Sequence, residues 1–215
     1  AIKTCRDIGN NDITILKCTT AYPTPLDEVN KAAQIAFQFT RAKKIFYPFA
    51  LFVSNLTAIL QGKGGSLDDE SFDPQTLTGI KHSGHQVILE QLRFALSYWQ
   101  ACPMKEKLLA LDNSCLNMSL VNAHAFNVDR LFLSGLTLID AFSTYSLTSK
   151  DTAYSSLLDY SFDKLEELYN FCPDNFAHKY YLLQAEKFRL DKMSEWEAIP
   201  FYEQALASAK KNGFL

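Results

Sequence analysis

The chain has 215 residues, 47% of them hydrophobic and 21% charged, so it is long enough to bury the core of one large or two small globular domains. Its formal net charge of −3 gives no electrostatic reason to expect nucleic acid or an anionic membrane as a partner. Aromatic residues reach 13% and include 16 phenylalanines, which predicts a core rich in large rings.

The cysteines indicate a reducing compartment, because they are odd in number, widely spaced and without a C-x-x-C pair. They are Cys5, Cys18, Cys102, Cys115 and Cys172. The N-terminus lacks the basic-then-apolar pattern of a signal peptide. The most apolar run, residues 45–60, is interrupted by Pro48 and is too short to span a bilayer comfortably. We therefore expect a cytoplasmic protein with free thiols.

Residues 1–30 differ in character from the rest of the chain. A short helical fragment ends at Gly9, and residues 12–18 (DITILKC) are β-branched and partly alternating, which predicts the one convincing strand. A loop with two prolines follows, and Pro25 suits the first position of a new helix. A lone strand has no partner for its backbone groups, so we expect it to be frayed, helical or paired with another chain.

From residue 31 onward the pattern is helical. Two long stripes of apolar residues recur with strict +4/+3 spacing, which predicts one buried face on each of two long helices. The first stripe is Ile35, Phe39, Ala42, Phe46, Phe49, Val53, Leu56 and Leu60. The second stripe is Val121, Ala125, Val128, Phe132, Gly135, Ile139 and Phe142. Pro48 should kink the first helix, while Gly135 predicts a close helix–helix approach on the second.

Shorter patterns predict four more helices. A loop at residues 62–79 precedes a helix that stops before Pro103, and a short helix follows. A helix capped by Ser149 or Asp151 ends before Pro173, where another begins. The apolar positions of the four are Ile88, Leu92, Ala95 and Trp99; Met104, Leu108 and Leu111; Tyr154, Leu158, Leu165 and Tyr169; and Tyr181, Ala185 and Phe188. Short connections between long helices predict antiparallel neighbours.

The last helix has the clearest end signals. Ser194 and Glu197 form an S-x-x-E capping box at its start. Gly213 suits a left-handed C-cap, with Phe214 or Leu215 available for the apolar contact of that motif. We therefore predict a helix over most of residues 194–213.

Ala198, Tyr202 and Ala205 repeat at +4 and +3 on this helix, which places two small residues and one aromatic on a single face. Such spacing on the second helix of a pair is typical of tetratricopeptide-like repeats. The face expects a following helix that the chain does not contain, so we predict an array truncated at its C-terminus. These three residues and Phe214 form the candidate interface, exposed or covered by a partner. Pro200 falls inside the predicted helix, where proline is unfavourable. Either the first turns of the helix tolerate it, or the helix begins later.

No catalytic, cofactor-binding or metal-binding set is predicted. Residues 62–66 (GKGGS) miss the spacing of a phosphate-binding loop and follow a helix, which favours a flexible turn. The acidic residues within 68–73 lack the spacing and glycine of an EF-hand, which favours a solvated loop. The histidines imply no three-ligand metal site and are interpreted as capping, packed or exposed side chains. They are His82, His85, His124 and His178.

Several strings in the second half of the chain carry a family resemblance. They are Leu116-Asn117-Met118-Ser119, Asp129-Arg130-Leu131-Phe132, Asn175-Phe176-Ala177-His178-Lys179-Tyr180, Ala185-Glu186, Ala198, Tyr202-Glu203-Gln204-Ala205 and Ala209-Lys210-Lys211-Asn212-Gly213-Phe214. Through them, residues from about 45 to 215 resemble the helical region of large signalling proteins that join a Ser/Thr-kinase-like domain, an AAA-type ATPase, a GAF domain and a histidine kinase. The resemblance implies a tetratricopeptide-like region that links or regulates flanking domains and carries no catalytic residues.

A second resemblance covers the N-terminus. Residues 12–25 (DITILKCTTAYPTP) and 27–30 (DEVN) are similar to one strand and loop of sialic acid synthase-like enzymes. That family has a (β/α)8 barrel that condenses phosphoenolpyruvate with an amino sugar, using a divalent metal. Its members often place a metal-binding histidine immediately before the cysteine, where this chain has Lys17. One strand of eight cannot form a barrel or its active site.

We therefore expect an all-α protein in which residues 31–215 form antiparallel helical hairpins of a tetratricopeptide-like array. Residues 1–30 are expected to be a sialic acid synthase-like fragment rather than an independent domain, and the chain a fusion joined near Asn30–Lys31. The predicted function is a non-catalytic protein-interaction or interdomain scaffold of a signalling kinase, without a cofactor and with a protein or flanking domains as partner. The alternative is a fragment of a sialic acid synthase-like enzyme.

Overall fold

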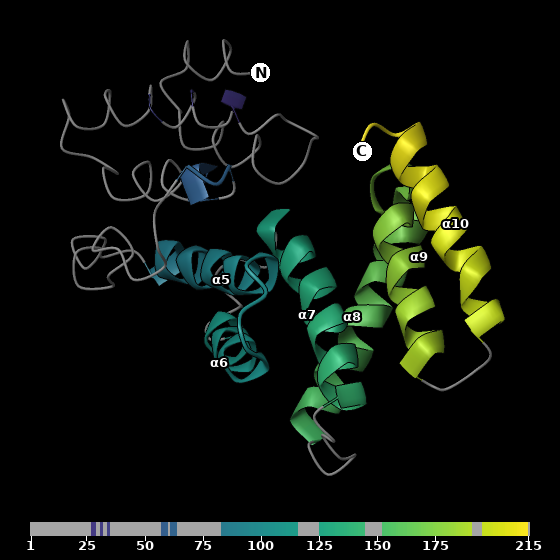
Figure 1. The fold of residues 1–215 in the computed structure, drawn as a ribbon, viewed down its shortest axis with the longest axis horizontal. Helices are drawn as coiled ribbons and strands as arrows, with labels where there is room; N and C mark the ends of the chain where they lie inside the picture. Colours follow the sequence, from purple (N-terminus) through teal and green to yellow (C-terminus); the bar gives the residue numbers. More distant parts are fainter. Residues whose placement is uncertain are drawn as a thin grey trace. The chain divides into compact units, whose positions relative to one another are not determined.

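A computed structural model of the chain describes residues 27, 28, 31, 34, 57–59, 61–63, 83–115, 125–144, 152–190 and 195–214. Every regular element among them is an α-helix (Figure 1). The six longer helices are α5 (Ser83–Trp99), α6 (Met104–Cys115), α7 (Ala125–Thr144), α8 (Thr152–Phe171), α9 (Pro173–Leu190) and α10 (Glu195–Lys211). The predicted all-α fold class is therefore confirmed for these residues. The predicted strand, the boundary near residue 30 and most of the first long stripe lie outside them.

The chain forms two compact units. The first comprises Ala1–Leu89 and Asn117–Ala125, and the second comprises Glu90–Leu116 and Phe126–Leu215. Nearly all of the described residues belong to the second unit, which contains α6, α8, α9 and α10 and most of α5 and α7. The second unit is therefore the one whose packing and surface can be analysed.

In the first unit, Gly62 and Lys63, the first two residues of the glycine-rich string at 62–66, form the C-terminal cap of a helix. The Lys63 N–H donates to the Ala58 carbonyl at 2.9 Å, and the Gly62 N–H donates to the Ile59 carbonyl at 3.0 Å. Gly62 has a φ of 67°, so these bonds form a Schellman cap with glycine in the left-handed position. This turn agrees with the sequence, which predicts a turn here and not a phosphate-binding loop.

Helix α5 ends with the same cap, but with an alanine in the left-handed position. The Cys102 N–H donates to the Ser97 carbonyl, and the Ala101 N–H donates to the Tyr98 carbonyl, both at 3.0 Å. Ala101 has a φ of 52°, which costs a residue with a Cβ atom about 1 kcal/mol. Pro103 follows and cannot continue the helix, so α5 stops where the sequence predicts.

Two clusters of buried side chains hold the second unit together. The first joins α5, α6 and α7 through Phe94, Ala95, Leu111, Leu133 and Leu138. The second joins α7, α8 and α9 through Ile139, Phe162, Leu165 and Leu183. Helix α7 contributes to both clusters, which makes it the central helix of this unit. Trp99 corrects the predicted α5 stripe, because it is the last residue of the helix and is 49% exposed.

Helices α7 and α9 approach closely at Gly135, as the sequence predicts. A Cβ atom at Gly135 would lie 2.6 Å from Cδ1 and 2.9 Å from Cδ2 of Leu183. Before this point along both helices, Asp129 of α7 forms an ion pair with Lys179 of α9. The residue numbers of the contacting pairs increase together along the two helices, from Asp129 with Lys179 to Gly135 with Leu183. Helices α7 and α9 therefore run parallel.

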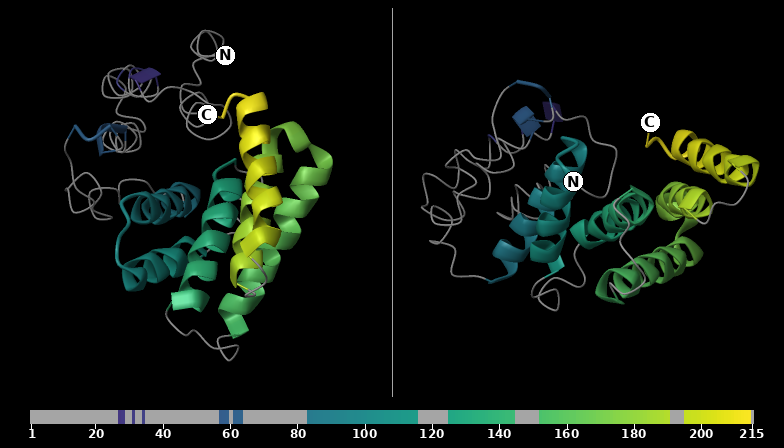
Figure 2. Two further views of the ribbon diagram at one scale, coloured as in Figure 1. Left: turned by 45° about the vertical axis from the view of Figure 1, so that its right-hand side comes forward. Right: turned by 60° about the horizontal axis from the view of Figure 1, so that its bottom comes forward.

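Helices α8, α9 and α10 lie side by side, and α9 packs against both of the others (Figures 1 and 2). Only Cys172 separates α8 from α9. Close to this connection, the ring of Tyr169 stacks on that of Tyr180 with centroids 4.8 Å apart, and its hydroxyl lies 2.8 Å from the hydroxyl of Tyr181. A short connection with such contacts beside it is the geometry of antiparallel neighbours.

The Gly135 contact gives a test of this packing. We expect Gly135→Ala to destabilise the protein by about 1–3 kcal/mol, because the new methyl group enters the space of the fully buried Leu183. In a Leu183→Ala background the sign should reverse, since the space is then free and alanine favours the helix by about 1 kcal/mol over glycine. Urea unfolding of the four proteins measures both effects, and destabilisation of equal size in both backgrounds would contradict the close approach.

Candidate interaction surface

Helix α10 carries three of the four residues of the candidate interface, and the fourth, Phe214, lies in the Schellman cap that ends the helix. The Phe214 N–H donates to the Ala209 carbonyl at 2.9 Å, and the Gly213 N–H donates to the Lys210 carbonyl at 3.4 Å. Gly213 has a φ of 74°, which confirms the predicted left-handed cap. The helix begins at Glu195 and contains Pro200, so its first turns tolerate the proline.

The predicted interface residues lie on the side of α10 that faces the rest of the unit. Ala198 and Ala205 are 3% and 7% exposed, and Ala209 continues the same buried face. Tyr202 is half-buried and bonds to a residue of α9, and the ring of Phe214 also contacts α9. Helix α9 therefore uses this face within the chain. A contact of these residues with another protein stays a prediction.

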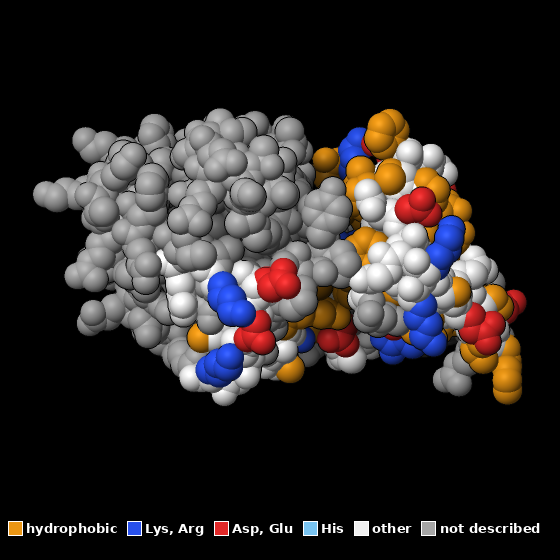
Figure 3. All heavy atoms as spheres, turned by 90° about the horizontal axis from the view of Figure 1, so that it is seen from above, with side chains coloured by type: hydrophobic (Ala, Val, Ile, Leu, Met, Phe, Trp, Pro, Cys, Tyr) orange, Lys and Arg blue, Asp and Glu red, His pale blue; other side chains and the backbone are white. Residues whose placement is uncertain are grey.

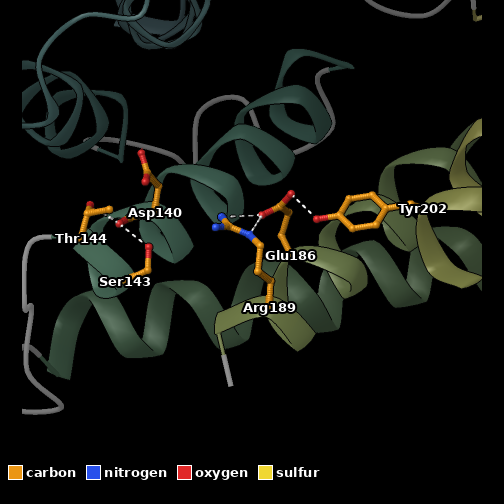
Figure 4. A network of polar contacts seen from close by, with 6 residues as sticks. All are labelled: Asp140, Ser143, Thr144, Glu186, Arg189 and Tyr202. Carbon is orange, nitrogen blue, oxygen red and sulfur yellow. Dashed lines mark hydrogen bonds and ion pairs between the residues drawn. The ribbon is translucent and has the colours of Figure 1, made fainter. Parts of the chain in front are cut away.

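Tyr202 belongs to a polar network around Glu186 of α9 (Figure 4). The Tyr202 hydroxyl donates to one carboxylate oxygen of Glu186 at 2.7 Å, and the guanidinium of Arg189 donates to the other at 2.8 Å. Burial and the hydrogen bond to Glu186 raise the pKa of Tyr202 to about 12. The same carboxylate, by hydrogen bonding and charge, raises the pKa of Arg189. The network therefore keeps both side chains protonated and ties α10 to α9.

Two further helices approach this network. Burial, followed by the charges of Glu186 and Asp140, raises the pKa of Tyr98 on α5. On α7, the hydroxyls of Ser143 and Thr144 donate to the backbone carbonyl of Asp140 at 2.9 and 2.6 Å (Figure 4). The ends of α5, α7 and α9 thus share a region of negative charge. Arg189 is the cation that balances part of it.

The C-terminal cap of α10 contacts the first half of α9 through the aromatic ring of Phe214. Phe214 stacks on His178 with ring centroids 4.2 Å apart and an interplanar angle of 26°. Burial, and then the charge of Lys179, lower the pKa of His178 to about 4, so the imidazole is neutral at pH 7. The sequence analysis interprets His178 only as a capping, packed or exposed side chain. It misses this contact because the partner, Phe214, follows α10 and lies 36 residues further along the chain.

Three large apolar side chains of α10 remain exposed beside the face of its buried alanines. Trp196 is 79% exposed, Ile199 is 41% exposed and Leu206 is 48% exposed. At 100° per residue they fall within an 80° arc of the helix, and α10 is the outermost helix of its unit (Figures 1 and 2). Sequence reasoning missed this side, although the +3 and +7 spacing of these residues was a signal for it.

Exposed large apolar side chains also occur on other described helices, at Trp99 of α5, Leu109 of α6 and Tyr160 and Phe171 of α8. Leu109 of α6 is 63% exposed, but the residues one turn away on its helix are exposed and polar. These neighbours are Lys105, Glu106, Asp112 and Asn113. On the face shown in Figure 3, apolar side chains reach the surface between basic and acidic ones, so neither sign of charge dominates it.

Metal-binding and membrane-spanning features are absent from the residues that the structure describes. They contain no group of three or more histidine, cysteine, aspartate or glutamate side chains that could hold a metal ion. None of their helices is long and apolar enough to cross a membrane. The three described cysteines, Cys102, Cys115 and Cys172, are free thiols.

The comparisons with known proteins concern the N-terminus alone. The model of the NeuB family matches residues 1–39 of the 215-residue chain. This match supports the sialic acid synthase-like resemblance of the N-terminal segment, of which the structure describes only Asp27, Glu28, Lys31 and Gln34. Neither the curated proteins nor the solved structures contain a match to the chain.

The link between α9 and α10 can be tested at Tyr202. We expect Tyr202→Phe to lower the free energy of unfolding by about 1–2 kcal/mol, because it removes a hydrogen bond to a charged group. A double-mutant cycle with Glu186→Gln, followed by urea unfolding, should give a coupling energy of about 1 kcal/mol. Tyr160→Phe, at a position 46% exposed, is the control and should change stability by less than about 0.5 kcal/mol. A coupling energy of zero would contradict the network.

Proposed function

We propose that the helical part of the chain is a non-catalytic protein-interaction or interdomain scaffold, working in the cytoplasm. The observation that carries the proposal is the exposed apolar side of α10, formed by Trp196, Ile199 and Leu206. Exposed apolar side chains grouped on one surface favour binding, because covering them with a partner removes apolar area from water. The free thiols of the described cysteines support a reducing compartment.

The order of helices supports a tetratricopeptide-like array. Helices α7 and α9 run parallel and meet at Gly135, while α8 and α10 each pack against α9. Successive helix pairs whose first helices stack in parallel through a small residue are typical of such arrays. We therefore infer that the helices of the second unit belong to a helical repeat-like domain and that this domain links or regulates the other domains of a signalling kinase.

Site-specific photo-crosslinking tests the proposal. The photoreactive residue p-benzoylphenylalanine replaces Leu206 in one variant and Leu109 in a matched control, since Leu109 is also exposed but the residues one turn away from it on its helix are polar. We expect the probe at 206 to form a defined protein adduct on irradiation in cells, identified by mass spectrometry, and the probe at 109 to form none. Absence of an adduct at 206, or the same adducts at both positions, would overturn the proposed surface.

The NeuB match to residues 1–39 favours a second candidate function, that of a sialic acid synthase-like enzyme. That activity condenses phosphoenolpyruvate with N-acetylmannosamine in the presence of a divalent metal. We expect this chain to show no turnover in such an assay with Mn²⁺, because the match covers 39 residues and a barrel active site takes residues from the ends of several strands. Consumption of phosphoenolpyruvate that depends on both N-acetylmannosamine and Mn²⁺ would establish the enzyme instead.

A further inference from the structure

The imidazole ring of His178 holds a buried nitrogen without a hydrogen-bond partner. Its Nδ1 atom is buried and bonds to no group in the described part of the chain. The ring of Phe214 stacks on the imidazole, with centroids 4.2 Å apart. In the protonated form both ring nitrogens carry a hydrogen, and both need an acceptor. The cation would therefore bury an N–H group at Nδ1 that these residues leave without an acceptor, whichever tautomer the neutral ring adopts.

The charges around His178 do not compensate for this loss. The charged groups of the neighbouring turns are Asp129 of α7, Asp174 and Lys179 of α9, and Lys210 and Lys211 of α10. Each carboxylate already has a cation as partner, since Asp129 pairs with Lys179 and Asp174 pairs with Lys211. Burial, and then the charge of Lys179, lower the pKa of His178. The folded protein therefore holds this side chain neutral at a position that opposes its protonation.

The contact of Phe214 with His178 anchors the last turn of α10. The ion pair of Lys211 with Asp174 also lies at this end, but both side chains are more than 70% exposed, so it contributes little. The earlier turns of α10 are held separately, through the hydrogen bond from Tyr202 to α9. Loss of the ring contact should therefore loosen the C-terminal end of α10 and leave its earlier turns in place.

We propose that His178 and Phe214 form an acid-sensitive latch, in which protonation of His178 releases the C-terminal end of α10 from α9. Release exposes the imidazole to water, which accepts both of its N–H groups. Proton uptake therefore accompanies opening, and acid favours the open form. This inference goes beyond the proposed function and does not depend on whether the exposed side chains of α10 bind a partner.

The pH range of the latch follows from the two states of His178. Its pKa is lowered to about 4 in the closed form, from an ordinary value of 6.5. The closed form is therefore fully favoured above pH 6.5, and it loses stability as the pH falls toward 4. These two values would shift the opening equilibrium about twentyfold between pH 7 and pH 5. Partial solvent exposure of the ring and attraction of the cation to the face of Phe214 reduce the shift, so we expect about tenfold.

Histidine titration by NMR tests the closed state of the latch. The ring signals of the four histidines can be assigned by substituting each one in the full chain. We expect the His178 signal to titrate with a midpoint below about 5.5. In Phe214→Ala, which uncovers the imidazole, the midpoint should rise toward about 6.5. A wild-type midpoint above this limit, or a midpoint that does not move in the variant, would overturn the latch.

Amide hydrogen exchange tests the release. The amides of residues 212–214 donate to backbone carbonyls of the last turns of α10. After correction for the intrinsic exchange rate at each pH, we expect their opening equilibrium to rise about tenfold from pH 7 to pH 5. His178→Phe keeps a ring that can stack but takes up no proton, so its opening equilibrium should change by less than about twofold.

Two controls assign the acid response to the latch. In the wild type, the amides of Tyr202 and Ala205 should not share the rise, because they lie in the turns that Tyr202 ties to α9. His178→Gln is a second variant without a titrating side chain, and circular dichroism at neutral pH establishes that each variant is folded. An equal rise in the wild type and in the folded variants, or an equal rise along the whole of α10, would show that acid acts elsewhere and would overturn the proposal.

Discussion

The close approach of α7 and α9 is the constraint on which the second unit depends. Gly135 leaves no room for a Cβ atom beneath Leu183, so the Leu183 side chain packs directly on the backbone of α7, which a larger residue at position 135 would prevent. This contact sets the register in which Asp129 reaches Lys179. It also gives α9 one side fixed against α7 and α8, and leaves the other side to receive α10.

Helix α10 divides its sequence between a buried and an exposed face that lie next to each other around the helix, and each face has a different physical role. Toward α9 it presents alanines, which allow close packing but bury little apolar area. The contacts that add specificity lie around them, at Tyr202 with Glu186 and at Phe214 with His178. Away from α9 the helix presents its larger apolar side chains to solvent. The larger apolar residues of α10 therefore contribute little to the core of the unit, which this helix joins through its alanines.

The sequence predicted the local features of this fold well, because helix ends and helix stripes depend on neighbouring residues. The cap at Gly213 and the close approach at Gly135 both follow from short patterns and are confirmed. The candidate interface shows the limit of such patterns. Periodicity placed Ala198, Tyr202 and Ala205 on one face, but it could not tell which neighbour covers that face, since spacing within one helix does not show how that helix packs on the preceding one. The contact of His178 with Phe214 was missed for the same reason, because 36 residues separate the two rings along the chain.

The stability of α10 and the use of its outer side are physically linked. Pro200 lacks an N–H group, so α10 forgoes the backbone hydrogen bond that this position would otherwise donate to the carbonyl of Trp196. The helix therefore depends on its tertiary contacts more than an uninterrupted helix of 17 residues would. Stacking of Phe188 on Phe201, with centroids 4.8 Å apart, provides one such contact beside the proline. A change that weakens the contacts of α10 with α9 should therefore also disturb the arrangement of its exposed side chains Trp196, Ile199 and Leu206.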